Sequence, residues 1–191
     1  MRDDEKRRRF EQLMLPHLDA GLNLARWLTH NDHDAQDVVQ EAFVRAIRYI
    51  DGFRGDNPRG WLLQIVRNTC FSWLKENRPT ELLVLDDADG VLHEIAVPAA
   101  DEPPAIAMRN AERVHINRAI ASLPIAYREV LVLRELEELS YKNIAHVAGI
   151  PIGTVMSRLA RARSLLQQAL APSVRPTHRA VPPSIDAVLK P

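Results

Sequence analysis

The most informative stretch of this chain runs from Ser140 to Arg163 and reads SYKNIAHVAGIPIGTVMSRLARAR. Ser140 suits the N-cap of a short helix, because its hydroxyl can accept a hydrogen bond from a free backbone N–H. Gly149 suits the end of that helix, since glycine takes a left-handed backbone conformation at little cost. Pro151 has a fixed φ and no N–H, which suits the first turn of a second helix. The pattern predicts two helices joined by a tight turn.

The second predicted helix has an apolar side and a basic side. Val155, Leu159 and Ala162 would face the first helix, while the arginines near its end would face outward. Two such helices form a helix-turn-helix that can enter a DNA major groove. The alternative is an amphipathic hairpin with a solvated basic face. The grouping of arginines favours DNA binding.

The same stretch carries a family resemblance. Ser-Tyr-x-x-Ile-Ala from Ser140, followed by Gly-x-Pro-x-Gly-Thr-Val-x-Ser-Arg-Leu-x-Arg-Ala-Arg from Gly149, resembles the C-terminal promoter-binding domain of extracytoplasmic-function (ECF) sigma factors of bacterial RNA polymerase. Three upstream stretches resemble the N-terminal domain of that family, in the family's order: Asp34–Phe43, Phe53–Asn57 and Trp61–Cys70. The resemblance covers roughly residues 10–78 and 110–170.

Apolar residues recur at helical spacing along most of the chain, and no strand alternation competes. The expected fold is all-α, with two small helical domains joined by a flexible acidic linker, the second containing the helix-turn-helix. We expect an N-terminal sigma domain at 1–78, a linker at 79–108, a C-terminal domain at 109–171 and a proline-rich tail at 172–191. The tail has five prolines in twenty residues and is expected to be poorly ordered.

The charge distribution is more informative than the total charge. Lys+Arg and Asp+Glu both number 25. The segment 79–108 has 7 acidic and no basic residues, whereas 109–171 has 9 basic and 5 acidic ones. Local field rather than net charge governs contact with phosphates, so the C-terminal domain remains a DNA-binding candidate. The acidic linker is open to two interpretations, mimicry of nucleic acid on the polymerase or mere solubility.

Two of the helices expected in the N-terminal half carry the candidate functional residues. Asp32 or Asp34 is expected to cap a helix that extends to Ile50 with one continuous apolar stripe. After a short loop, Asn57 and Pro58 provide an N-cap and a first helical residue for a helix over about 58–77. In the resembled family the first of these helices docks on core RNA polymerase. The residues that resemblance implies for this contact are Asp34, Asp37, Gln40, Glu41, Arg45 and Arg48.

The resemblance also implies that the loop and the second helix recognise and melt the promoter −10 element. Capturing an unstacked base costs a few kcal/mol, which aromatic, amide and basic groups can offset. Phe53 and Trp61 are interpreted first as core anchors. Asn68 matches a −10-contacting position, whereas Ser72 stands where the family frequently has aspartate. The −10 candidates are Phe53, Arg54, Asp56, Asn57, Trp61, Arg67, Asn68, Lys75 and Arg78.

Recognition of the −35 element is expected from the second helix of the helix-turn-helix. An arginine can pair with guanine O6 and N7 or hold a phosphate. Met156 stands where relatives often have lysine or arginine, and Arg163 is expected at a phosphate or in solvent. The −35 candidates are Thr154, Met156, Ser157, Arg158, Arg161 and Arg163.

Other chemistry finds little support. Cys70 is the only cysteine, so an intrachain disulfide is excluded. His30 and His33 have no third convergent ligand, and neither a nucleophile triad nor a phosphate-cradling glycine loop is present. We expect no metal, no cofactor, no small-molecule substrate and no enzymatic activity. No apolar run approaches a membrane span and the N-terminus lacks a secretion signal, so no membrane insertion and a cytoplasmic location are expected.

The sequence is interpreted as a sigma factor whose partners are core RNA polymerase, promoter DNA and an anti-sigma factor. Two alternative functions are also considered. One is an autonomous helix-turn-helix regulator, which the N-terminal half and the acidic linker argue against. The other is a sigma-mimicking adaptor that binds an anti-sigma factor, which would be expected to lack the arginines at 158 and 161.

Overall fold

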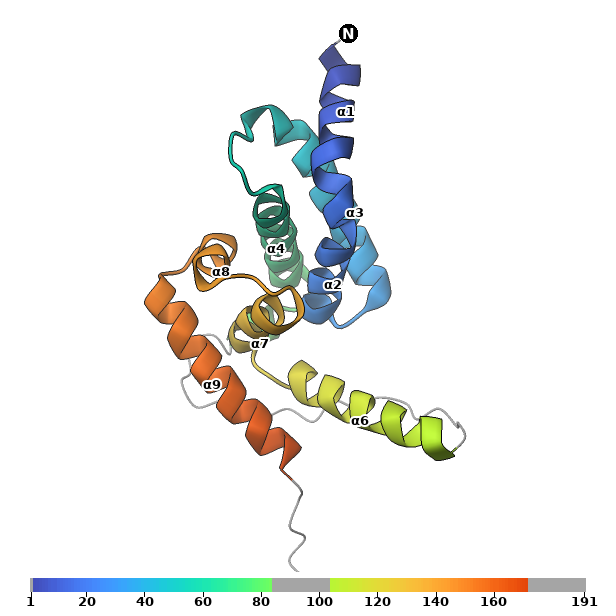
Figure 1. Ribbon diagram of the computed structural model, residues 1–191, viewed down its shortest axis with the longest axis vertical. Helices are drawn as coiled ribbons and strands as arrows, with labels where there is room; N and C mark the ends of the chain where they lie inside the picture. The colour runs from blue at the N-terminus through green and yellow to red at the C-terminus, as the bar shows by residue number, and fades with distance from the viewer. Residues whose placement is uncertain (1, 84–103, 172–191) are drawn as a thin grey trace, which may run out of the picture.

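The computed structural model describes residues 2–83 and 104–171, and in those ranges every regular element is helical (Figure 1). The first range contains α1 (Arg2–Met14), η1 (Leu15–His17), α2 (Leu18–Thr29), α3 (Asp32–Tyr49), η2 (Ile50–Gly52), α4 (Pro58–Asn77) and α5 (Pro79–Leu83). The second contains α6 (Pro104–Ala121), α7 (Ile125–Leu131), η3 (Val132–Leu136), α8 (Tyr141–Ala148) and α9 (Ile152–Leu170). The all-α expectation is confirmed.

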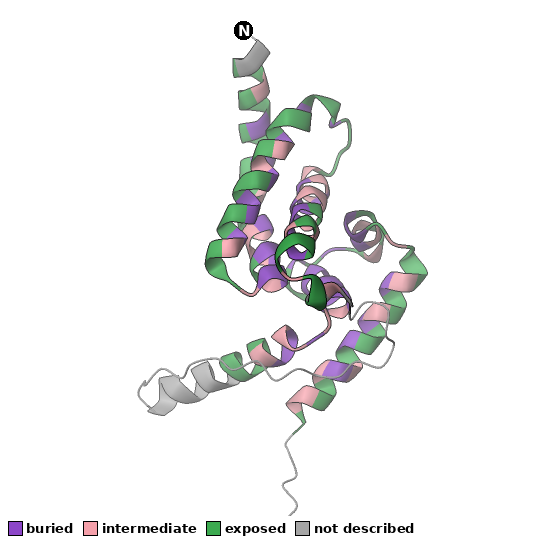
Figure 2. Ribbon diagram, turned by 180° about the vertical axis from the view of Figure 1, so that it is seen from behind, coloured by how far each residue is buried: buried purple, intermediate pink, exposed green. Residues whose placement is uncertain are grey.

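The N-terminal domain is built on α2, α3 and α4, which pack against one another in pairs. Each helix contributes a buried apolar stripe, seen as purple bands that face inward in Figure 2. Helix α1 adds Phe10 and Met14 to this core, and the Phe10 ring meets Phe43 edge-on with centroids 5.5 Å apart. Fully buried members include Leu24, Leu28, Val38, Ala42, Leu62 and Val66.

The start of α3 differs from the expectation. Its N-cap is Asn31, whose side-chain oxygen accepts hydrogen bonds from the backbone N–H groups of His33 (2.8 Å) and Asp34 (3.1 Å). The helix begins this early because His30 ends α2 in a left-handed conformation with φ 55°, and Asn31 then lies extended. Asp32 and Asp34 lie in the first turn, where a carboxylate is still favourable near the positive end of the helix dipole.

The helix-turn-helix is formed as expected. The Ser140 hydroxyl accepts a hydrogen bond from Asn143 N–H (3.2 Å), and Gly149 ends α8 at φ 67°. Pro151 was predicted in the first turn of α9 and is instead its N-cap, because the helix begins at Ile152. Val155, Leu159 and Ala162 of α9 are buried toward the rest of the domain. Helix α9 also packs against α6 and α7.

The two domains contact each other directly. Helix α4 packs against α8, and α2 packs against α7 and η3. The side chain of Arg67, in the middle of α4, also reaches Glu129 of the short helix α7, which lies near the centre of the molecule in Figure 1. One face of α4 is therefore covered by the C-terminal domain.

Helical structure extends into both ends of the expected linker, as α5 at its start and the first turn of α6 at its end. Pro79 and Pro104 are each the first residue of their helix, a position where the missing N–H is not needed. The remainder of the expected linker, residues 84–103, and the tail at 172–191 lie outside the described residues.

Candidate functional site

The outward face of α3 carries most of the residues expected to bind core polymerase. Asp37, Gln40, Glu41 and Arg48 are exposed, and Arg45 is half-buried. Their ion pairs are local: Asp37 meets His33 at 3.2 Å, and Glu41 pairs with Arg45 one turn away. Val44 is 54 % exposed in the middle of this face. The face thus combines solvated polar side chains with one exposed apolar side chain, Val44, which lies outside the folded core.

Asp34 stands apart from that face. Its carboxylate accepts a hydrogen bond from the Arg78 guanidinium at 3.0 Å, and Arg78 also donates to the backbone carbonyl of Thr29 at 2.8 Å. Both side chains are partly buried. The predicted polymerase contact and the predicted −10 contact therefore bind each other, and together they tie the end of α4 to the junction between α2 and α3.

The loop before α4 is held by its own side chains. The Asn57 side-chain oxygen accepts a hydrogen bond from Gly60 N–H (2.9 Å), as the predicted N-cap requires. A Cβ at position 60 would lie only 2.5 Å from the Asn57 amide nitrogen, so a larger residue there would displace the capping side chain. Phe53 is buried with its ring 5.2 Å from that of Trp61, whereas Arg54 and Asp56 are exposed. The interpretation of Phe53 as a core anchor agrees with this packing.

Three −10 candidates form one stripe along α4. Trp61, Asn68 and Lys75 recur every seven residues, which places them on the same side of the helix. Asn68 and Lys75 are exposed, and Trp61 is half-buried. An aromatic, an amide and an ammonium group on one stripe are suited to stacking, hydrogen bonding and phosphate contact respectively.

Arg67 lies beside that stripe and crosses to the other domain. Its Nε donates to Glu129 Oε1 of α7 at 2.7 Å, and its guanidinium lies 3.8 Å above the Phe71 ring centroid. Glu129 is 0 % exposed, and its second oxygen has no hydrogen-bond partner in the described parts of the chain. Burial raises the pKa of the Glu129 carboxyl, while Arg67 opposes that rise.

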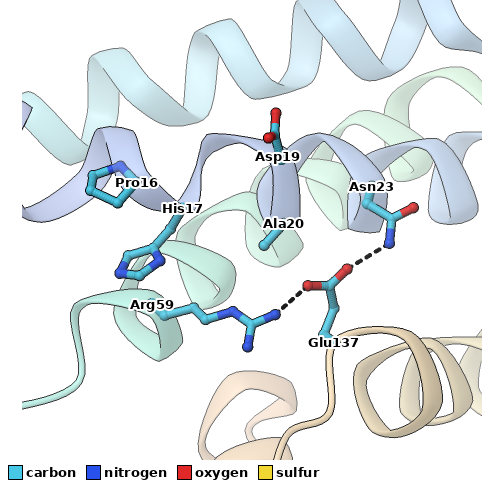
Figure 3. A pocket seen from close by; sticks show the side chains of 7 residues that line it. All are labelled: Pro16, His17, Asp19, Ala20, Asn23, Arg59 and Glu137. Atoms are coloured by element: carbon cyan, nitrogen blue, oxygen red, sulfur yellow. Dashed lines mark hydrogen bonds and ion pairs between the residues drawn. The ribbon is translucent and has the colours of Figure 1, made fainter.

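A second carboxylate of the C-terminal domain contacts the N-terminal domain at a cleft between them (Figure 3). Glu137 accepts hydrogen bonds from Arg59 of α4 and Asn23 of α2, both at 2.5 Å. Nearby, the Gln64 side chain donates to the backbone carbonyl of His146 at 3.0 Å. Sequence reasoning missed these contacts. The available signal was the pair Arg128 and Glu129, charged residues inside an otherwise apolar run.

The −35 candidates on α9 fall into two groups. Met156, Ser157 and Arg161 are exposed, and Met156 is 52 % so. Thr154 is half-buried, and its backbone carbonyl accepts a hydrogen bond from the Ser157 hydroxyl at 3.1 Å.

The other two arginines of α9 have carboxylate neighbours. Arg163 donates to Glu135 at 2.7 Å, which raises the pKa of its guanidinium. Arg158 is half-buried, and its charge, like that of Arg67, opposes the rise in the pKa of Glu129 that burial causes. The charges of Arg67 on α4 and Arg158 on α9, the two helices predicted to bind DNA, thus both act on Glu129.

Burial shifts the pKa of two further ionisable groups, Cys70 and His30. Cys70 is buried, and burial raises the pKa of its thiol to about 12. Burial, with the charges of Arg128 and Arg78, lowers the pKa of His30 to about 3. In the described ranges no group of His, Cys, Asp and Glu is arranged to hold a metal, and none of those helices could cross a bilayer.

Comparison with protein families gives two matches in chain order. Residues 13–80 match the model described as sigma-70 region 2, and residues 113–166 match sigma-70 region 4. The first range contains α2 to α4, and the second contains the helix-turn-helix.

Individual relatives match over most of their length. The chain is 36 % identical over 173 residues to the RNA polymerase sigma-H factor of Pseudomonas aeruginosa, covering 88 % of this chain and 90 % of that protein. It is 37 % identical over 151 residues to the ECF RNA polymerase sigma-E factor of Escherichia coli K12, covering 74 % and 76 % respectively.

Two solved structures are similar in fold. The sigma factor RpoE of Bartonella quintana, solved with the anti-sigma factor NepR, has a TM-score of 0.63 at 27 % identity and covers 86 % of this chain and 98 % of that one. CnrH, solved with the cytosolic domain of CnrY, has a TM-score of 0.57 at 28 % identity and covers 84 % and 86 %. With its two sigma regions in order and its helix-turn-helix formed, the chain belongs to the ECF sigma factors, which bind core RNA polymerase and direct promoter-specific transcription initiation.

Proposed function

We propose that three surfaces of this sigma factor divide the work of initiation. The outward face of α3 binds core polymerase, the loop 53–57 and α4 recognise and open the −10 element, and α9 reads the −35 element. Residues 1–78 and 109–171 are the corresponding functional domains. The observation that carries the proposal is the exposure of polar side chains on α3 and α9 that the folding core does not use.

The α3 face is suited to a protein partner. Asp37, Glu41 and Arg48 flank the exposed Val44, so a partner helix could bury an apolar centre within a charged rim. Interfaces commonly have this arrangement, in which the apolar centre supplies affinity and the charged rim supplies specificity.

The two DNA-binding surfaces are suited to different tasks. On α4, Trp61, Asn68 and Lys75 provide the stacking, hydrogen-bonding and phosphate contacts that hold a melted strand. On α9, Arg161 and Ser157 can bond to base edges or phosphates, and Met156 can contact a thymine methyl group. Duplex recognition therefore belongs to α9 and capture of single-stranded DNA to α4.

The proposed partners follow from this division. Core RNA polymerase supplies the phosphodiester chemistry, so we assign this chain no catalytic residue, no metal and no cofactor, and we place its action in the cytoplasm, where polymerase and promoter DNA are found. The similar structure of RpoE in complex with the anti-sigma factor NepR supports an anti-sigma partner for this chain as well. An autonomous helix-turn-helix regulator would not require the polar face of α3.

A charge-reversal experiment tests the polymerase surface. We expect Asp37→Lys with Glu41→Lys to abolish co-purification with core RNA polymerase, because it reverses two charges on the exposed face without touching the core. Circular dichroism should be unchanged. The matched control reverses two exposed carboxylates of α1, Asp4 and Glu5, and should bind normally. Full binding by the α3 variant would contradict the assignment.

A further inference from the structure

One side of helix α1 faces the chain that leads from α3 to α4. Phe10 and Met14 on this side are buried in the N-terminal core, and Lys6 lies one turn before Phe10 on the same face. Arg9 is the residue next to Phe10. Helix α1 packs against α3, η2 and α4, and it stands at the top of the molecule in Figure 1. The core therefore fixes α1 where two basic side chains can reach the loop before α4.

These two side chains bond the backbone at the start of that loop. The Lys6 ammonium donates to the backbone carbonyl of Arg48 at 2.9 Å and pairs with the Asp51 carboxylate at 3.2 Å. A cation suits this place, because α3 ends there and the last turn of a helix leaves carbonyls without helical partners. The Arg9 guanidinium donates to the backbone carbonyl of Phe53 at 2.8 Å. Helix α1 thus holds the chain at both ends of the stretch 48–53.

The contact with Arg9 completes the fixation of Phe53. The N–H of Phe53 donates to the Ile50 carbonyl at 3.1 Å, its own carbonyl accepts from Arg9, and its ring is buried. At the other end of the loop, the Asn57 side chain caps α4. Residues 54–56 between these two points are exposed. The exposed part of the −10 candidate loop is therefore a short segment whose two ends are held in place.

We propose that Lys6 and Arg9 are positioning residues for promoter opening, which hold the loop so that residues 54–56 meet the melted strand in one conformation. This inference rests on the proposed role of loop 53–57 and α4 at the −10 element. Both residues precede residue 13, where the match to sigma-70 region 2 begins, so the contact lies outside the matched region. A loop that is already held in its binding conformation loses less conformational entropy when it binds DNA.

Arg9→Ala tests this proposal, because it removes the bond to Phe53 and leaves the loop's own sequence unchanged. We expect backbone amide hydrogen exchange in residues 51–57 of the full-length protein, measured by mass spectrometry, to become faster. Opening of the −10 region by the variant holoenzyme, followed with permanganate, should fall roughly three- to tenfold, the ratio that one net hydrogen bond is worth. Co-purification with core RNA polymerase should stay at the wild-type level, because the outward face of α3 is not changed.

Three further variants control for charge, for chemistry and for folding. Arg8→Ala removes the same charge from the neighbouring exposed position of α1, and it should change neither exchange nor opening. Arg9→Lys keeps a charged donor at the position and should recover part of the opening that Arg9→Ala loses. Lys6→Ala frees the loop from its other contact with α1, and it serves as the second test when Arg9→Ala does not fold.

Exchange and opening equal to those of Arg8→Ala in both test variants would overturn the proposal. So would a loss of opening that is matched by a loss of core binding, because it would indicate a general folding defect. Asn68→Ala, measured alongside, separates this inference from the proposed function. Faster exchange with normal opening in Arg9→Ala, while Asn68→Ala fails to open DNA, would overturn the positioning role alone. Normal opening by Asn68→Ala would instead refute the −10 assignment of α4, and hydrogen exchange would still decide whether α1 holds the loop.

Discussion

The two helices proposed to bind DNA differ in how far their side chains are exposed and free of internal bonds. On α9, Met156, Ser157 and Arg161 are exposed and lie on the outward side of a helix whose inner side packs in the C-terminal core. Arg67 of α4 bonds the carboxylate of Glu129 in the other domain. Arg78, which follows α4, bonds the carboxylate of Asp34 in its own domain. The candidate residues of α9 named here are exposed, whereas two candidate arginines of α4 are held by internal ion pairs.

This difference teaches that a DNA-binding residue cannot be ranked by its type alone. Arg161 and Arg67 are both arginines at predicted DNA positions, but only Arg161 is exposed. Arg67 must break its ion pair with Glu129 before it can bond DNA. Its net contribution to the free energy of DNA binding is therefore the difference between two similar bonds. We therefore expect Arg161 to contribute directly to the affinity for the −35 element. Arg67 can contribute at the −10 element only after its bond to Glu129 in the other domain is broken.

The largest effect is expected at the exposed helix. Arg161→Ala should weaken promoter binding by holoenzyme by about 1–3 kcal/mol, because a base or phosphate contact is lost without any internal compensation. The measurement is a mobility-shift titration on a promoter selected by wild-type holoenzyme, at fixed salt. Arg163→Ala is the matched control and should cost less, because Arg163 already pairs with Glu135. Equal losses would show that the ion pair between Arg163 and Glu135 does not reduce the contribution of Arg163 to DNA binding.

A smaller effect is expected at α4. Asn68→Ala should impair strand opening by about 0.5–1.5 kcal/mol, the usual net value of one hydrogen bond, while binding to the −35 element is retained. Permanganate footprinting of the −10 region, combined with mobility shift, separates the two steps. Asn77→Ala removes an amide from the same helix whose nitrogen bonds the Trp73 carbonyl, and it should open DNA normally. Normal opening by the Asn68 variant would show that the capture site lies elsewhere.

The smallest effect concerns pH and the buried side of the domain contact. His30 has its pKa lowered from 6.5 to about 3, because of burial and the charges of Arg128 and Arg78. The unfolded chain therefore takes up a proton below pH 6.5 that the folded chain excludes, so stability falls as pH falls through this range. The expected loss between pH 7 and pH 6 is about 0.7 kcal/mol.

Urea unfolding at the two pH values measures that loss. His30→Asn should show a smaller decrease, since asparagine tolerates the left-handed conformation and does not titrate there. His33→Asn, at an 84 % exposed side chain, should behave as wild type. The same pH dependence in wild type and the His30 variant would contradict the burial of a neutral His30.

Much of the local structure could be predicted from the residues. The helix over 58–77 has the predicted bounds, and the Ser140 cap and the Gly149 turn are as expected. These features depend on neighbours a few residues apart, which a sequence displays directly. The cap of α3 was predicted one to three residues late, because Asp32 and Asp34 compete with Asn31 and only the backbone of His30 decides between them.

The residues that make up the candidate surfaces could be predicted from the family motifs. Which of these residues are exposed and which are bonded to other parts of the protein could not. The positions of Asp37, Glu41, Ser157 and Arg161 on exposed faces follow from helical periodicity. The bonds from Arg67 to Glu129, from Arg78 to Asp34 and from Arg59 to Glu137 join residues far apart in sequence.

The sequence by itself determined the helices, their caps, the helix-turn-helix and the order of the sigma motifs, because each depends on local spacing and backbone preference. Only the tertiary structure decided which predicted DNA contacts are free and which are engaged. The reason is that Arg67 bonds Glu129 of the other domain and Arg78 bonds Asp34 of another helix, and the energy of such a bond depends on distance and burial. Neither quantity can be derived from the spacing of residues along the chain.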